Sequence, residues 1–138
     1  AAARALGLDL KQASEIALNS KKPVKITSTC TVFAETEVLE HLTMGERLED
    51  ILYGAYLGIA VRSVGLLRRV GVEPEITFQG GVSLNKGMVK AVEEVLHMKV
   101  NTSPLTMYGG AIGAALYGLK RFTRKEDIVA PEKLEVKM

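Results

Sequence analysis

A double-glycine turn carries the residue types that best suit ligand chemistry in this chain. Residues 77–88, TFQGGVSLNKGM, join an apolar strand to an amphipathic helix. Gly80 and Gly81 lack a Cβ, so they can adopt positive φ and let a ligand approach the backbone closely. Asn85 and Lys86 lie in the first turn of the helix, where free N–H groups attract a phosphate and the side chains can bond a ribose hydroxyl. A turn that needs glycine for geometry alone is the alternative.

A second glycine-rich junction near the C-terminus repeats this pattern. Residues 101–121, NTSPLTMYGGAIGAALYGLKR, follow a short strand around Val100 and place Gly109 and Gly110 at the start of a small-residue helix. Helix packing and ligand contact both remain open for this segment. Two such turns in one α/β unit are unlikely to be incidental, and they favour a nucleotide site over a purely geometric role.

Three segments together resemble a known family. FQGGVSLNKGM resembles the adenosine motif of the actin, sugar kinase and Hsp70 ATPase superfamily, and YGGAIGAAL resembles its second hinge segment. STCTVFAETEVLEHL, residues 28–42, is similar to the cluster-cysteine segment of activators of 2-hydroxyacyl-CoA dehydratases and of the related ATPase subunits of benzoyl-CoA reductase. The resemblance covers residues 24–118. It implies that ATP or ADP with Mg is bound, with contacts at Gly80, Gly81, Val82, Asn85, Lys86, Gly109 and Gly110.

The resemblance also implies a fold, an α/β C-terminal lobe of an actin-like (ribonuclease H-like) ATPase with a central mixed sheet flanked by helices. The residues alone predict helices at 10–18 and 45–70 and alternating helices and strands along the rest of the chain. We expect strands at 23–26 and 76–78, the latter in the sheet interior. Residues 1–121 are expected to form the lobe, and residues 122–138 an extended tail.

Cys30 is the only cysteine in the sequence. A single cysteine forms no intrachain disulfide, and by default it is a small buried hydrophobe. The resemblance implies a different role, because the matching cysteine of the activators is one of two per subunit. A homodimer then supplies four thiolates to a 4Fe-4S cluster. The start of the helix that carries Val38 would stabilise such a thiolate.

The chain departs from the family pattern at its start. The family's second cysteine, in an Asn-Asp-Lys-Cys segment, and its two phosphate turns lie upstream of the residues that match positions 3–7. We therefore expect the C-terminal part of an activator. A dimer of this part alone would bring only two thiolates, and we expect it neither to rebuild the cluster nor to hydrolyse ATP.

Composition and charge narrow the remaining functions. The 138 residues, 47% hydrophobic, fit one domain with a sizeable core. The 18 basic and 16 acidic residues are interspersed and Trp is absent, so no footprint for nucleic acid is visible.

Arg62 interrupts the apolar 45–70 segment, which indicates a core helix rather than a membrane span. At the start of that helix, Glu46 and Asp50 complement the helix dipole. The resemblance to the superfamily implies an alternative, in which they face an adenine or a ribose. A cytoplasmic setting is expected.

The function that the resemblance implies is ATP-dependent electron transfer. A ferredoxin or flavodoxin would reduce the cluster, and nucleotide-driven lobe closure would promote transfer of a low-potential electron to a dehydratase or reductase component. Two alternatives stay open: a sugar or metabolite kinase of the same superfamily, with Cys30 merely structural, and a non-catalytic oligomerisation domain. An upstream Asn-Asp-Lys-Cys segment would favour the activator, and an upstream catalytic aspartate the kinase.

Overall fold

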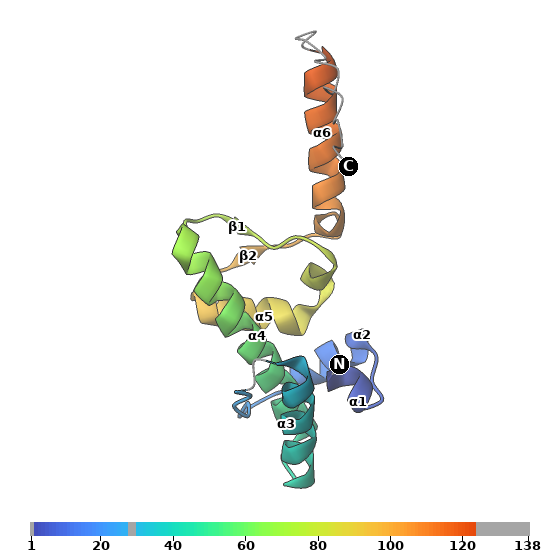
Figure 1. Cartoon of the computed structure of the whole chain (residues 1–138), viewed down its shortest axis with the longest axis vertical. Helices are drawn as coiled ribbons and strands as arrows, with labels where there is room; N and C mark the ends of the chain where they lie inside the picture. The colour runs from blue at the N-terminus through green and yellow to red at the C-terminus, as the bar shows by residue number, and fades with distance from the viewer. Residues whose placement is uncertain (1, 28–29, 124–138) are drawn as a thin grey trace, which may run out of the picture.

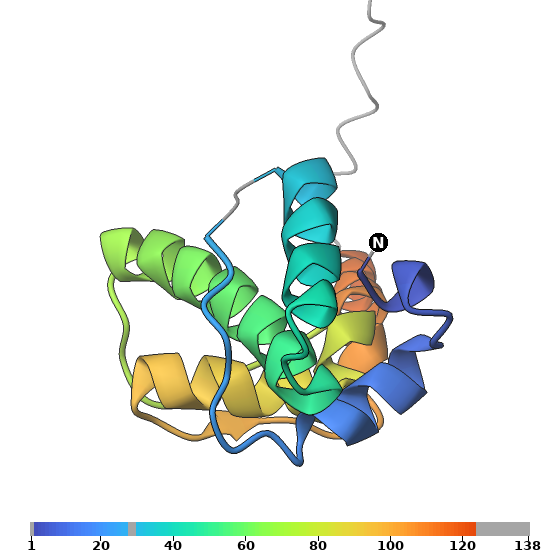
Figure 2. The same cartoon turned by 90° about the horizontal axis from the view of Figure 1, so that it is seen from below.

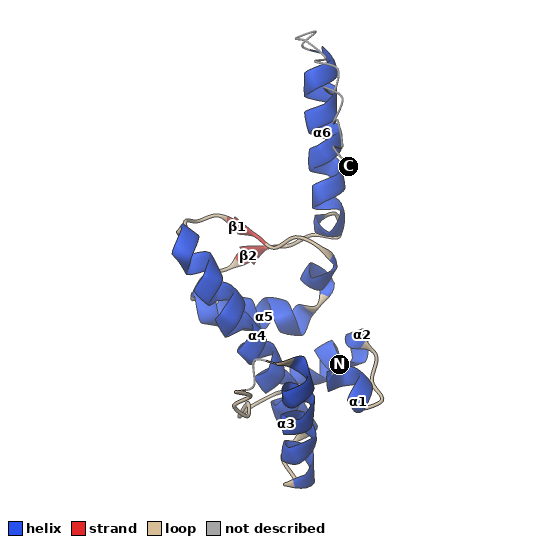
Figure 3. Cartoon of the chain, in the orientation of Figure 1, coloured by secondary structure: helices blue, strands red, loops and turns tan. Residues whose placement is uncertain are grey.

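The computed structural model describes residues 2–27 and 30–123 (Figure 1). Helices dominate these residues, and the two short strands lie next to each other (Figure 3). The elements in chain order are α1 (Ala2–Ala5), α2 (Leu10–Ala17), α3 (Thr31–Thr43), α4 (Leu48–Val70), β1 (Ile76–Thr77), the 3-10 helix η1 (Gly81–Leu84), α5 (Lys86–Leu96), β2 (Val100–Asn101), the 3-10 helix η2 (Thr106–Tyr108) and α6 (Gly109–Thr123).

Helix α4 forms the centre of the core. It contacts α2, α3 and α5, and α3 and α5 lie on different sides of it in Figure 2. Its side chains Leu52, Tyr53, Ala60 and Val64 are buried with the apolar faces of α2 and α5. By length and composition alone α4 could cross a membrane, but the core helix of a globular lobe passes the same test. The contacts on both sides account for its apolar composition.

Residues 23–27 cross α4 as an extended segment that pairs with no strand in the described part of the chain. The Val24 N–H donates to the Asp50 carbonyl at 3.2 Å, and the Thr27 N–H donates to both carboxylate oxygens of Glu37 at 2.9 and 3.1 Å. The predicted strand at 23–26 is therefore wrong. Its alternating Val and Ile suit a strand, but groups of α3 and α4 take the hydrogen bonds that a strand would supply.

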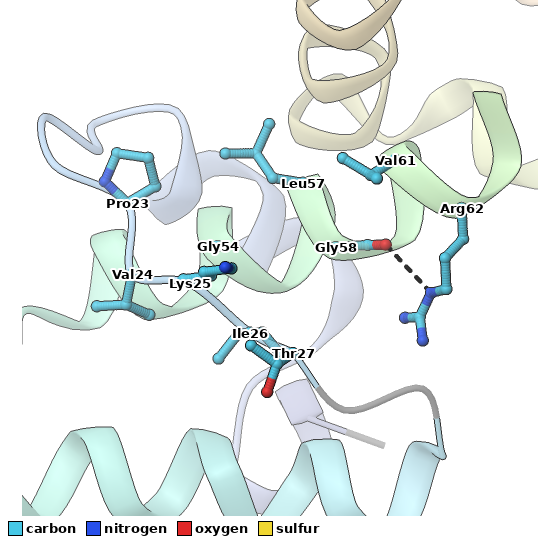
Figure 4. Close-up of a pocket in the computed structure, with 10 residues that line it drawn as sticks. All are labelled: Pro23, Val24, Lys25, Ile26, Thr27, Gly54, Leu57, Gly58, Val61 and Arg62. Carbon is cyan, nitrogen blue, oxygen red and sulfur yellow. Dashed lines mark hydrogen bonds between the residues drawn. The ribbon is translucent and has the colours of Figure 1, made fainter. Parts of the chain in front are cut away.

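The segment 23–27 and α4 also enclose a pocket of about 470 Å³ (Figure 4). Gly54 and Gly58 line it on the α4 side, one helical turn apart, and the segment passes close to Gly54. A Cβ at Gly54 would overlap the carbonyl oxygen of Val24. The close approach at these two glycines is therefore a contact between a helix and an extended segment.

The two predicted strands after α4 are present and parallel. Ile76 pairs with Val100 and Thr77 with Asn101, and the Phe78 N–H donates to the Asn101 carbonyl at 3.0 Å. Helix α5 connects the strands, as a parallel pair requires. The interior position predicted for the strand that ends at Phe78 is wrong for the described residues, because β1 has β2 as its single neighbour there.

Helix α6 extends away from the rest of the molecule (Figure 1). It contacts η2 at its base, and all its residues from 110 to 123 are exposed. The helix continues through Thr123, so the first two residues of the predicted tail at 122–138 are helical. The rest of that tail, residues 124–138, lies outside the described residues.

Candidate functional site

The two glycine-rich junctions lie side by side, although they are far apart in the sequence. The Gly80 N–H donates to the Thr106 carbonyl at 3.1 Å. The Ser83 hydroxyl lies 2.7 Å from the Gly80 carbonyl oxygen and 2.8 Å from the Thr106 hydroxyl. These bonds join η1 to η2, so the seven residues predicted to contact a nucleotide belong to one surface region.

Open backbone is the main feature of this region. Gly80 has φ of 90°, a conformation that side chains rarely adopt, and it begins the turn. A Cβ at Gly81 or Gly110 would meet no atom within 4 Å, so a ligand can reach the backbone at both positions. Gly109 differs, because the side chain of Gln79 occupies the space beside it. A ligand that touches Gly109 must displace this flexible amide.

Val82, Asn85 and Lys86 lie along the same turn. The Val82 side chain is 56% exposed, and Lys86 is an exposed residue at the first position of α5. Asn85 is the N-cap of α5: its Oδ1 accepts from the Met88 N–H at 2.9 Å. Its Nδ2 donates to the hydroxyl of Tyr56 at 3.1 Å. The Asn85 side chain therefore stabilises the helix start as well as facing the turn.

Residues of α2 and α4 hold the first turn of α5, and the sequence did not reveal them. The Ser14 hydroxyl accepts from the Gly87 N–H at 3.0 Å in a buried bond. The ring of Tyr56 lies so close that a Cβ at Gly87 would be 2.8 Å from it. Ser14 and Tyr56 occupy positions on core helices where periodicity indicates only packing. The one available signal was Gly87, a glycine in the first turn of a helix.

Asp50 does not belong to this region. Its Oδ1 accepts from the Ser20 hydroxyl at 2.7 Å and from the backbone N–H groups of Lys21 and Lys22 at 2.9 Å each. The bond from Ser20, followed by those from the backbone, holds the pKa of the Asp50 carboxyl below its ordinary value. Asp50 thus fixes the turn between α2 and residues 23–27, and its possible contact with adenine is not supported by this geometry.

Cys30 occupies the N-cap position of α3, and its side chain is exposed. The predicted position of Cys30 at the start of a helix is confirmed. The alternative, in which Cys30 is a small buried hydrophobic residue, is wrong because the side chain is exposed. Exposure beside free helix N–H groups suits a thiolate ligand. A 4Fe-4S cluster needs four such ligands. Cys30 fits one ligand position of such a cluster, and the chain does not supply the other three. Among residues 2–27 and 30–123, no group of three or more His, Cys, Asp or Glu side chains could hold a metal ion.

Comparison with known proteins identifies the family. Residues 1–118 match the model of the BadF/BadG/BcrA/BcrD ATPase family, and the chain belongs to this family. It is 43% identical over 119 residues to the (R)-2-hydroxyglutaryl-CoA dehydratase activating ATPase of Acidaminococcus fermentans, a match that covers 86% of this chain and 46% of the relative. It is 39% identical over 123 residues to the activator of lactoyl-CoA dehydratase of Anaerotignum propionicum, covering 89% and 48%.

A solved structure supports the same assignment at the level of the fold. The activator of the 2-hydroxyisocaproyl-CoA dehydratase from Clostridium difficile with bound ADPNP superposes with a TM-score of 0.81 and 34% identity, covering 94% of this chain and 50% of that one. The predicted resemblance and the α/β, actin-like ATPase lobe are confirmed. The chain spans about half the length of the curated relatives it matches.

Proposed function

We propose that this chain is part of an ATP-dependent activator that serves an acyl-CoA dehydratase or a benzoyl-CoA reductase-like component. The observation that carries the proposal is the adjacency of the two glycine turns, with open backbone at Gly81 and Gly110. Relatives of this chain include activators of acyl-CoA dehydratases and one of the subunits of benzoyl-CoA reductase, which favours the activator over the kinase alternative.

The adenosine part of the nucleotide is proposed to lie on the two turns. An adenosine needs a backbone that it can approach closely more than it needs charge, and Gly80, Gly81 and Gly110 supply one. Gly109 would join them once the Gln79 side chain moves aside. Asn85 would bond the ribose, and Lys86 would face the phosphates from the start of α5. The structural relative carries bound ADPNP, which supports ATP or ADP as the ligand class. No step of hydrolysis is assigned to residues of this chain.

Electron transfer is the finer part of the proposal. Cys30 would supply one thiolate per subunit to a 4Fe-4S cluster shared by a homodimer, and upstream cysteines would complete the ligand set. When bound, such a cluster supplies one-electron chemistry. The contribution of this chain is the helix α3, whose N-terminal N–H groups stabilise the Cys30 thiolate. A ferredoxin or flavodoxin would be the electron donor, in the cytoplasm.

The substitution Gly81→Val in the intact protein tests the nucleotide site. Space beside Gly81 is open and its φ is not positive, so the fold should tolerate valine. The branched side chain would occupy the space that the adenosine needs. We expect ADP affinity to fall by more than about tenfold, measured by isothermal titration calorimetry.

Gly65→Val is the matched control for this experiment. Gly65 also has open space around it, but it lies on α4, away from the turns. We expect wild-type ADP affinity for Gly65→Val and similar thermal unfolding for both variants. Unchanged ADP affinity in Gly81→Val would remove the nucleotide from these turns.

A further inference from the structure

The Asn85 amide has a defined orientation because it is bonded at both ends. Its Oδ1 accepts from the Met88 N–H at 2.9 Å, and a backbone N–H can only donate. The oxygen end is therefore fixed toward Met88, and Nδ2 must face the Tyr56 hydroxyl, 3.1 Å away.

The two bonds leave a defined hydrogen-bonding capacity on Asn85. An asparagine amide has two N–H donors and two lone pairs on its oxygen. After Met88 and Tyr56 are bonded, one N–H and one lone pair remain. A sugar hydroxyl both donates and accepts, so it matches this pair. Asn85 is half-buried on the turn that includes Gly81, where the proposed function places the adenosine.

The ring of Tyr56 is itself held in place. It packs against the backbone of Gly87, where an added Cβ would be 2.8 and 3.1 Å from two ring atoms. The Gly87 N–H in turn donates to Ser14. The cap of α5 already exists through Oδ1 of Asn85, so the Tyr56 bond is not needed for the helix start. Its effect is to restrain the other end of the amide.

We propose that Tyr56 is a positioning residue of the nucleotide site, holding the Asn85 amide so that its free N–H and lone pair meet a ribose hydroxyl. Tyr56 acts through Asn85 and does not itself contact the nucleotide. The inference rests on the proposed function and deepens it, because it assigns recognition of the ribose to a pair of residues from α4 and the start of α5.

Tyr56→Phe in the intact protein tests this inference. Loss of the hydroxyl removes one restraint on Asn85, and a single hydrogen bond of this kind corresponds to roughly 2- to 10-fold in affinity. We expect ADP affinity to fall by that factor. The same comparison of Tyr56→Phe with the wild type is made with 2′-deoxy-ADP and 3′-deoxy-ADP. For the analogue that lacks the hydroxyl bonded to Asn85, the substitution should reduce affinity less than it does for ADP, because the bond that Tyr56 supports is already absent.

Tyr53→Phe is the matched control. Tyr53 lies on the same helix, and its hydroxyl also reaches α5, donating to the Glu94 carboxylate at 2.6 Å. Burial and this carboxylate raise the pKa of Tyr53, so the hydroxyl stays a donor. If the tyrosine hydroxyls between α4 and α5 matter only for packing, Tyr56→Phe and Tyr53→Phe should both unfold at a lower temperature than the wild type. Neither substitution should then change the affinity for ADP relative to the affinity for its deoxy analogues. We expect Tyr53→Phe to bind ADP as the wild type does.

The outcomes separate this inference from the proposed function. If Tyr56→Phe binds ADP as tightly as the wild type does while Gly81→Val has lost ADP affinity, the role of Tyr56 is overturned and the proposed nucleotide site is not. An equal loss in Tyr53→Phe would assign the effect to helix packing and would also overturn it. A wild-type protein that binds no ADP would overturn the proposed function and this inference with it.

Discussion

Cys30 combines an exposed side chain with a place at the start of a helix. Its carbonyl accepts from the Ala34 N–H at 2.9 Å, which starts the helical bonding of α3, while the side chain makes no capping bond. A thiol in that position is accessible and lies at the positive end of the helix dipole. These properties favour a ligand over a core residue, although one thiolate cannot hold a cluster.

The substitution Cys30→Ala therefore separates the two halves of the proposed function. In the intact protein it would leave two thiolates per dimer of the four required, so we expect iron content to fall close to zero. ADP affinity should remain at the wild-type value, since Cys30 belongs to α3 and not to the glycine turns. Iron analysis and calorimetry on the same preparation measure both quantities.

Cys30→Ser is the control for folding in that experiment. Serine is a favoured N-cap residue, so α3 should be retained while the soft thiolate ligand is lost. Wild-type iron content in either variant would return Cys30 to a structural role.

At the scale of elements, the contact between α4 and residues 23–27 depends on a glycine. Gly54 is buried, and a Cβ there would collide with the backbone carbonyl of Val24. The Val24 backbone is tied to Asp50 on the same helix, so it has little freedom to move away. The contact between α4 and residues 23–27 can therefore be tested by adding a single methyl group at Gly54.

We predict that Gly54→Ala destabilises the protein by about 1–3 kcal/mol, the usual cost of overpacking. Gly65→Ala on the same helix is the control, because nothing lies within 4 Å of its added Cβ. Alanine is the better helix former, so this control should be neutral or stabilising by up to about 1 kcal/mol. Urea unfolding of both variants measures the difference. Equal stabilities would show that residues 23–27 do not pack on α4 in this way.

Periodic apolar patterns predicted the helices and the later strands well. The helix expected at 45–70 is α4, Leu48–Val70, and the strand expected at 76–78 is β1 with Phe78 bonded just beyond it. The same kind of pattern failed at residues 23–26, because alternation shows which side chains are buried and not what the backbone pairs with. Local sequence carries no information on a partner that is an α-helix.

The sequence predicted the two glycine turns of the candidate site but not the residues that support them. Glycine pairs between a strand and a helix are local signals, so the two turns could be found from the sequence. The capping role of Asn85 was not predicted, since the sequence predicts a place for this residue within the first turn of the helix. The residues that support the turns could not be found, since the Gly87 bond to Ser14 joins positions 73 residues apart. The side-by-side arrangement of the turns likewise depends on tertiary contacts between η1 and η2.

The whole molecule brings the two turns to the base of α6. Helix α6 begins at Gly109 and extends outward from this point (Figure 1). The proposed nucleotide would therefore contact both the start of α5 and the start of α6. The superposition on a solved activator structure covers 94% of this chain, which supports this arrangement of the elements.

A crystal structure of the intact protein with ADPNP is the most direct test of the central claim. The account predicts an adenosine within about 4 Å of the backbone of Gly81 and Gly110, with a ribose hydroxyl bonded to the Asn85 amide. The Tyr56 hydroxyl should remain bonded to Asn85 in that complex. A nucleotide bound elsewhere, with both glycine turns free of ligand, would contradict the account.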